Sequence, residues 1–211
     1  MKKFYGFNSN ELKILNQLNT PQKIQTFLNK LPINFEEKGD TAMSPREVLK
    51  KKKAHCMEGA LLAATALWYH GKKPLLLDLV TTKDDDDHVV TLFKQNGCWG
   101  AISKTNHAVL RYREPIYKTV RELAMSYFHE YFKNNGKKTL RKFSVPFDLS
   151  KIEDKSWLTS GEDLWEINNL LEASKHFSIL SQSQIRKLCK AEPIEIEAGK
   201  ILEWKPKHRK K

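Results

Sequence analysis

The sequence predicts an α+β fold, because helical patterns occupy the first part of the chain and a short strand and a hairpin follow them. Residues 56–70 are apolar on almost every side, which is typical of a helix buried all round. Residues 75–80 form a short apolar run, which favours a buried strand. Residues 88–93 and 98–103 flank an Asn-Gly pair, a strong local signal for a β-hairpin.

Two helices are predicted ahead of the buried one. Thr20 is typical of an N-cap and Pro21 of a first helical position, and the apolar periodicity after them stops before Pro32. Ser44 and Pro45 repeat this start signal, and the short helix that they begin runs into a cluster of lysines.

Weaker signals place the elements after the hairpin. We expect a third strand at residues 106–113, helices at 120–132, 160–171 and 179–188, and a terminal hairpin at 194–204. A change in character near residues 140–150 predicts a core domain, residues 1–145, and a C-terminal helical and hairpin appendage with a basic tail, residues 146–211.

The composition favours a cytoplasmic protein that makes no use of a membrane. The chain has 211 residues, 40% of them hydrophobic, which is enough to bury a core. Its longest apolar run, residues 60–69, is too short to span a bilayer, and no apolar segment follows the N-terminal lysines as in a signal peptide. Three cysteines, an odd number, do not suggest a disulfide framework.

A net charge of +12 favours acidic partners. Two segments concentrate this charge, the lysines at 50–53 and the tail at 205–211. The simplest interpretation is a solvated helical turn and a disordered end, and the alternative is weak contact with a polyanion or nucleic acid through the tail. The sequence has no zinc-finger spacing, aromatic RNA-binding strand or Gly-rich phosphate loop.

Cys56 is the first candidate for chemistry. It lies at the predicted start of the buried helix, where unpaired N–H groups and the helix dipole lower the pKa of a thiol. The neighbouring lysines add positive potential, whereas Glu58 in the first turn opposes the effect. The alternative is a small cysteine buried in the core.

His88 is the candidate base for this thiol. It opens the first hairpin strand, and a strand that begins beside the helix N-terminus would present an imidazole to Cys56. With residues 96–97 at the centre of the turn, Ser103 shares the face of His88 and Asn106 points the other way. A longer turn or a bulge would reverse this parity. The alternative for His88 is a surface residue after the acidic loop.

No cofactor is expected, and a metal site has weak support. His55, Cys56 and His88 lack the paired ligand spacing of a zinc site. The four aspartates at 84–87 lack the alternation and the glycine of an EF-hand loop. The other two cysteines are expected to be buried or incidental.

Several segments around Cys56 and His88 form one further pattern. They are residues 44–49 (Ser-Pro-Arg-Glu-Val-Leu), residues 54–64 (Ala-His-Cys-Met-Glu-Gly-Ala-Leu-Leu-Ala-Ala), Gly71 with Pro74, His88 at a strand start, and Trp99 on the partner strand. This order resembles the transglutaminase-like core of the papain-like cysteine enzymes, over roughly residues 20–110. The resemblance implies an α+β core with N-terminal helices and a buried, cysteine-bearing helix packed on an antiparallel sheet.

The resemblance also implies roles for individual residues, with Cys56 as the nucleophile and His88 as the base. It implies a third residue, usually aspartate, four positions after the tryptophan, and this position holds Ser103. A serine hydroxyl can orient an imidazole but carries no charge to stabilise the imidazolium. Asn106 is the fallback orienter, by analogy with the amide of papain-type triads, and the aspartates at 86–87 are a further option.

The reaction that the resemblance implies is acyl transfer through a thioester on Cys56. Water as acceptor gives amide or peptide hydrolysis, and an amine gives cross-linking of a peptide or protein. The backbone N–H of Cys56 and one further donor would hold the oxyanion. The alternative is a catalytically weakened or inactive fold that binds an acidic partner or nucleic acid, which the serine at position 103 motivates.

Overall fold

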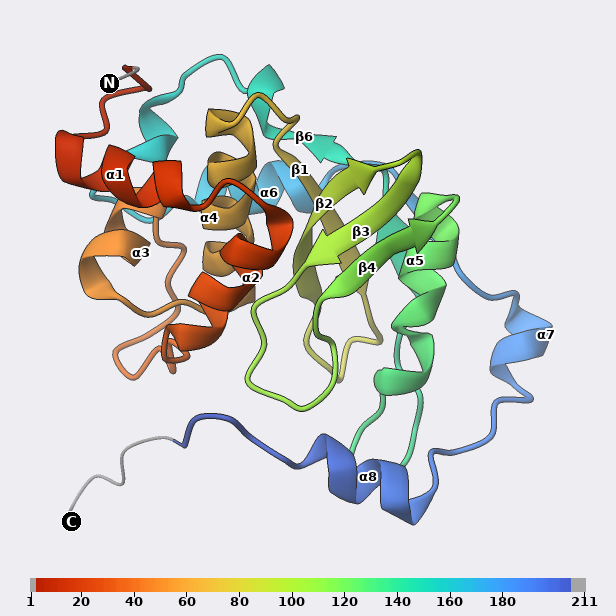
Figure 1. Ribbon diagram of the computed structural model, residues 1–211. Coiled ribbons are helices and arrows are strands. Elements are labelled where there is room, and N and C mark those ends of the chain that lie inside the picture. The colour runs from red at the N-terminus through yellow and green to blue at the C-terminus, as the bar shows by residue number, and fades with distance from the viewer. Residues whose placement is uncertain (1–2, 206–211) are drawn as a thin grey trace, which may run out of the picture.

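The structure, a computed structural model, describes residues 3–205 and confirms the α+β fold class (Figure 1). The helices are α1 (Ser9–Gln17), α2 (Pro21–Lys30), α3 (Pro45–Lys51), α4 (Cys56–Tyr69), α5 (Val120–Ser126), α6 (Trp165–Glu172), α7 (Gln182–Ile185) and α8 (Pro193–Gly199). The strands are β1 (Leu75–Val80), β2 (His88–Gln95), β3 (Cys98–Ile102), β4 (Arg113–Tyr117), β5 (Lys142–Ser144), β6 (Phe147–Asp148) and β7 (His176–Ser178). Single 3₁₀ turns are η1 (Phe128–Glu130), η2 (Leu149–Lys151) and η3 (Ser156–Leu158).

The strands form one antiparallel sheet. Its order is β4-β3-β2-β1-β5-β7, and β6 also pairs with β1. Strands β1, β2 and β3 match their predicted positions because each combines an apolar run with clear flanking turns.

Helix α4 lies against the sheet, with α1, α2 and α3 packed around it (Figure 1). All of its residues except Cys56 and Trp68 are buried, as its all-round apolar pattern predicts. The Thr91 hydroxyl donates to the Ala60 carbonyl at 2.6 Å and so ties β2 to the helix. Gly71, at φ +80°, follows the helix in the left-handed conformation that a C-terminal cap requires.

A second core covers the opposite face of the sheet. Leu123 of α5 and the adjacent Tyr127 are fully buried in it, together with Leu77 and Leu79 of β1. Because β1 is covered on both faces, its apolar residues do not alternate with exposed polar ones, and its one polar residue, Asp78, is buried.

The hairpin has the predicted turn and register. Asn96 and Gly97 have φ values of 49° and 79°, as a type I′ turn requires. Thr91 pairs with Ile102, which is the register of a two-residue turn. The parity that places Ser103 on the face of His88 is therefore correct.

Four later predictions need correction in their bounds. The third strand begins at Arg113 rather than at residue 106, because residues 106–108 pair with the C-terminal segment instead. The helix at 120–132 ends at Ser126, whose hydroxyl bonds back to the Leu123 carbonyl at 2.6 Å before η1 begins. The helix expected from residue 160 begins at Trp165, because Asp163, just before it, is bonded to a distant loop.

Asp163 accounts for that late start. Its carboxylate accepts a hydrogen bond from the Ala42 backbone N–H at 2.8 Å, so it anchors a distant loop rather than the first turn of α6. The helix expected at 179–188 is reduced to α7, because the backbone N–H of Ile179 bonds to the Arg141 carbonyl and extends the pairing of β7 with β5.

The predicted terminal hairpin is wrong. Its first half is α8, because Pro193 occupies the first helical position and the Glu195 carboxylate accepts from the backbone N–H of Glu192 at 2.7 Å. These start signals outweigh the Ile-Glu-Ile-Glu alternation that is typical of a strand.

The sheet continues past residue 145 through β6 and β7. The predicted division into residues 1–145 and 146–211 stays a prediction. Of the predicted basic tail, all but Lys205 lies outside the described residues. Within residues 3–205, no helix is long and apolar enough to cross a membrane.

Candidate functional site

Cys56 begins α4 and lies in the wall of a cleft of about 560 Å³. His88 of β2, the loop after β3 and part of α8 also line this cleft. Cys56 is partly exposed, whereas most of the helix behind it is buried. A thiol is thus presented to solvent at the positive end of a buried helix dipole.

The surroundings of Cys56 favour its thiolate. Burial alone would raise the pKa of the thiol, but hydrogen bonds with His55 and His88 and the charges of both rings lower it from 9.0 to about 5. Burial would lower the pKa of His55, but hydrogen bonds with Cys56 and Glu58 raise it to about 11. At neutral pH the thiolate therefore lies beside a protonated His55.

His88 is held by Ser103. The imidazole Nε2 lies 2.8 Å from the Ser103 hydroxyl oxygen, and the same hydroxyl donates to the Leu110 carbonyl at 2.5 Å. Because a hydroxyl has one proton, Ser103 can only accept from His88, so Nε2 carries a hydrogen. In the neutral ring, Nδ1 is then the unprotonated nitrogen, which is the form that a base requires.

Helix α2 fixes the backbone of Ser103. The Gln25 amide accepts from the Ser103 N–H at 2.9 Å and donates to its carbonyl at 2.7 Å. The next residue, Lys104, is also buried and donates to the Leu31 carbonyl at the end of α2. The loop that carries Ser103 is therefore attached to α2 at two adjacent residues.

Glu58 organises the first turn of α4. Its side chain is fully buried and accepts hydrogen bonds from Asn34, from Thr41 and from the backbone N–H groups of Met43 and His55. The protonated His55 ring lies 3.3 Å from the same carboxylate. Burial would raise the pKa of Glu58, but these contacts, His55 first, hold it below its ordinary value.

The sequence predicts that the negative charge of Glu58 opposes the thiolate of Cys56. In the structure Glu58 also has an indirect effect that favours the thiolate. The carboxylate stabilises the His55 cation, and that cation in turn stabilises Cys56. Glu58 thus acts on the thiol through a positive group that lies between them in the hydrogen-bond network.

The alternative orienters for His88, which are Asn106, Asp86 and Asp87, line the same cleft but make no hydrogen bond with the His88 ring among the described residues. The Asn106 amide accepts from the Trp204 N–H at 2.8 Å and donates to the Trp204 carbonyl at 2.9 Å. Asp87 accepts from the backbone and hydroxyl of Thr81, and Asp86 lines the cleft from the exposed loop. Among the hydrogen bonds of residues 3–205, the contact to the His88 ring nitrogen comes from Ser103.

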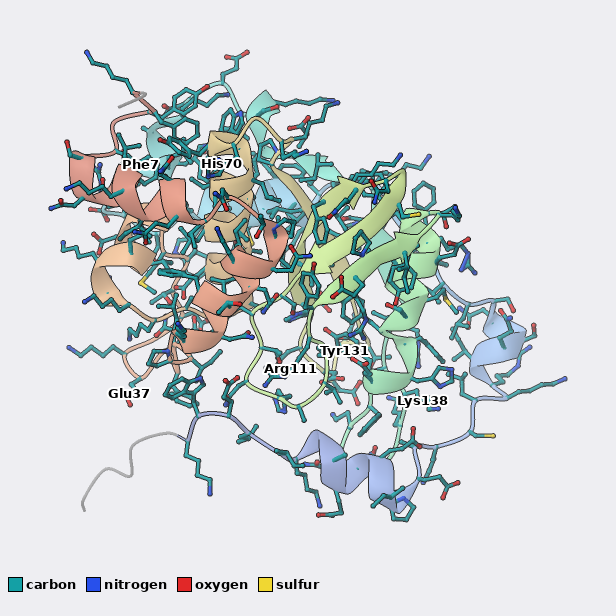
Figure 2. The ribbon with its side chains drawn as sticks, in the orientation of Figure 1. Phe7, Glu37, His70, Arg111, Tyr131 and Lys138 are labelled. Atoms are coloured by element: carbon teal, nitrogen blue, oxygen red, sulfur yellow. The ribbon has the colours of Figure 1, made fainter. Side chains whose placement is uncertain are left out.

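Tyr131 is a cleft residue that the sequence analysis did not single out. It is buried, and its hydroxyl has no hydrogen-bond partner within the described part of the chain. Burial raises the pKa of this phenol, and the negative charge of Cys56 adds to that effect, so the hydroxyl keeps its proton. Figure 2 shows Tyr131 and Arg111 on the side of the sheet toward α8.

The sequence suggests His55 only as a weak metal-ligand candidate and suggests no role for Gln25. The signal for His55 was present locally, because an N-cap position with Glu three residues later predicts a capping interaction. Gln25 left no local signal, since 78 residues separate it from Ser103. Among residues 3–205, no group of three or more His, Cys, Asp or Glu side chains is arranged to hold a metal ion.

A solved structure titled Legionella pneumophila LapG (EGTA-treated) aligns with 71% of this chain and with 82% of its own chain, at 14% sequence identity and a TM-score of 0.40. No protein-family model matches the sequence, and no curated protein matches it. The chemistry of the chain is therefore inferred from the residues of the cleft themselves.

Proposed function

We propose that this chain is a transglutaminase-like cysteine enzyme that transfers an acyl group through a thioester on Cys56, with amide or peptide hydrolysis as its reaction. The observation that carries the proposal is that Cys56 and His88 line one cleft, while the buried Ser103, outside that lining, holds the His88 ring. The lowered pKa of Cys56 supplies a nucleophile at neutral pH.

The proposed reaction has two steps. As the thiolate forms, the thiol proton passes to His88 Nδ1, and the Cys56 sulfur attacks the carbonyl carbon of the substrate. His88 then delivers this proton to the departing amine as the carbon–nitrogen bond breaks. His88 Nδ1 then takes a proton from water, whose oxygen attacks the thioester and releases the acid and the Cys56 thiolate. Ser103 keeps the ring in the tautomer that both steps use.

Two donors are proposed for the oxyanion. The first is the backbone N–H of Cys56, which lies at the N-terminus of α4. The second is the hydroxyl of Tyr131, because it lines the same cleft, keeps its proton and is left without a partner among the described residues.

The pH dependence of Cys56 alkylation by iodoacetamide tests the reactive thiol, with the labelled site identified by mass spectrometry. We expect half-maximal labelling near pH 5 in the wild type, and a midpoint displaced toward the ordinary thiol range in His88→Ala. Cys98 and Cys189 serve as internal references. If Cys56 is labelled no faster than these references and does not respond to His88→Ala, the proposed enzymatic function is excluded. The result would then favour the alternative, an inactive fold that binds an acidic partner or nucleic acid.

A further inference from the structure

The C-terminal segment after α8, here called the strap (residues 200–205), lies along the loop that carries Ser103. In Figure 1 the chain leaves α8 and passes beneath this loop, at the end of the sheet where β2 begins and β3 ends. Ile196 and Gly199 of α8 line the cleft that contains Cys56. The strap thus begins at the wall of the candidate site.

The strap pairs with the loop as an antiparallel strand does. The backbone N–H of Glu203 donates to the Asn106 carbonyl at 2.9 Å, and the N–H of Ala108 donates to the Ile201 carbonyl at 3.1 Å. Between these two bonds, His107 and Leu202 form an antiparallel bridge. This is main-chain recognition, which any extended peptide can satisfy.

Side chains add selectivity to this pairing. The Asn106 amide makes two hydrogen bonds with the backbone of Trp204, which replicate a further step of a β-ladder. Arg111 forms an ion pair with Glu203 at 3.0 Å. The loop therefore holds an extended segment whose acidic side chain faces Arg111.

Little apolar burial holds the strap and its helix in place. No residue of α8 is buried, and Ile194 and Ile201 are 77% and 60% exposed. The other contacts are main-chain hydrogen bonds, the two bonds of the Asn106 amide, a bond of the His107 ring with the Gly199 carbonyl and one partly exposed ion pair, and each is worth only about 1 kcal/mol. Trp204 is half-buried and adds some packing. A free peptide that offers the same contacts competes with the effective concentration of the tethered strap, so it binds more tightly once the strap is weakened.

We propose that the loop edge at Asn106–Ala108 is a docking edge for an extended peptide with an acidic residue opposite Arg111, and that the strap occupies this edge in the free protein. Docking itself needs only the edge. We further propose that the docked peptide is the substrate of Cys56, and this step rests on the proposed function. It is supported by the position of the edge, which follows directly after Ser103 and Lys104 in the loop that borders the cleft.

A fluorescein-labelled peptide with the strap sequence, Lys-Ile-Leu-Glu-Trp-Lys, tests this proposal by fluorescence anisotropy against the full chain. Glu203→Arg places two like charges together at Arg111, so it weakens the strap and leaves the edge intact. We expect this variant to bind the peptide about fivefold or more tightly than the wild type, equivalent to roughly 1 kcal/mol. Glu197→Arg is the matched control, because Glu197 pairs with Lys200 away from Arg111.

Two further measurements identify the site of binding. Asn106→Ala in the Glu203→Arg background removes the two amide hydrogen bonds that the Trp204 position receives, and it should weaken peptide binding about fivefold. A peptide with arginine in place of its glutamate should bind the Glu203→Arg variant more weakly, because it then meets Arg111. Equal affinity in the wild type, Glu203→Arg and Glu197→Arg, or affinity indifferent to Asn106→Ala, would overturn the docking edge.

This test can fail separately from the proposed function. Peptide affinity does not depend on the reactivity of Cys56, whereas the alkylation profile of Cys56 with iodoacetamide does not depend on peptide docking. In the Glu203→Arg variant, saturating peptide should also slow Cys56 alkylation, because Asn106 and His107 of the edge line the cleft. Alkylation unchanged at saturation would overturn the placement of the peptide beside Cys56.

Discussion

At the scale of single residues, His55 is the group whose hydrogen bond does most to lower the pKa of Cys56 against the effect of burial. We expect His55→Gln to move the midpoint of Cys56 alkylation upward by roughly 1 pH unit or more, toward the ordinary thiol value. His129→Gln, a substitution on the exposed surface, should leave the midpoint in place. An unchanged midpoint in His55→Gln would assign the low pKa to other causes.

Ser103 acts through His88 and is a positioning residue. Ser103→Ala removes the acceptor that fixes the His88 tautomer, and it leaves the Leu110 carbonyl without its donor. We expect turnover of p-nitrophenyl acetate to fall about tenfold or more, within the range of general base catalysis. Ser103→Thr should restore most of the rate because it keeps the hydroxyl. A rate lost equally in the alanine and threonine variants would argue against this role.

Tyr131 separates oxyanion stabilisation from thiol reactivity. Alkylation by iodoacetamide forms no oxyanion, whereas ester hydrolysis does. Tyr131→Phe should therefore slow p-nitrophenyl acetate hydrolysis by about a hundredfold and leave the alkylation midpoint unchanged. Tyr112→Phe is the matched control, since it also removes a buried hydroxyl without a partner but lies outside the cleft lining. Equal effects from both variants would exclude the donor role.

At the scale of elements, the first turn of α4 depends on Glu58. Glu58→Gln would bring an NH₂ group against the donors of Asn34, Met43 and His55, so we expect a loss of about 3 kcal/mol in the free energy of unfolding. Glu166→Gln, on the exposed side of α6, should cost little.

The pH dependence of this loss has a definite sign. Because folding lowers the pKa of Glu58, its contribution is fully present above the unfolded pKa and is lost as pH falls through the folded value. In urea unfolding, the gap between wild type and Glu58→Gln should be widest near neutral pH and close in acid. A gap that widens in acid would contradict the network.

The elements that the sequence predicts correctly are those whose signals are local. Helix α4 and strand β1 have continuous apolar patterns, and the hairpin has Asn-Gly at its tip, so each could be placed without knowledge of its neighbours. At α8 two local signals conflict, because the alternating Ile-Glu-Ile-Glu pattern predicts a strand and the proline start predicts a helix. Few packing contacts favour either the strand or the helix at this position, so the capping interactions determine that the segment is helical.

At the scale of the whole molecule, the site is assembled from segments far apart in the chain. The pairing of His88 with Ser103 could be predicted because both belong to one hairpin, whose register the turn fixes. The support of Ser103 by Gln25 could not, since it depends on how α2 packs on the sheet. The strap depends likewise on where α8 ends.

Intact-mass and peptide mass spectrometry during p-nitrophenyl acetate turnover tests the central claim most directly, because it detects the acyl group on a named residue. We predict acetylation at Cys56 that forms in a burst and decays with turnover. It should be slow in His88→Ala and absent in Cys56→Ser. Acetyl groups spread over lysines, or a Cys56 adduct that forms no faster than at Cys98, would contradict a nucleophile activated by His88.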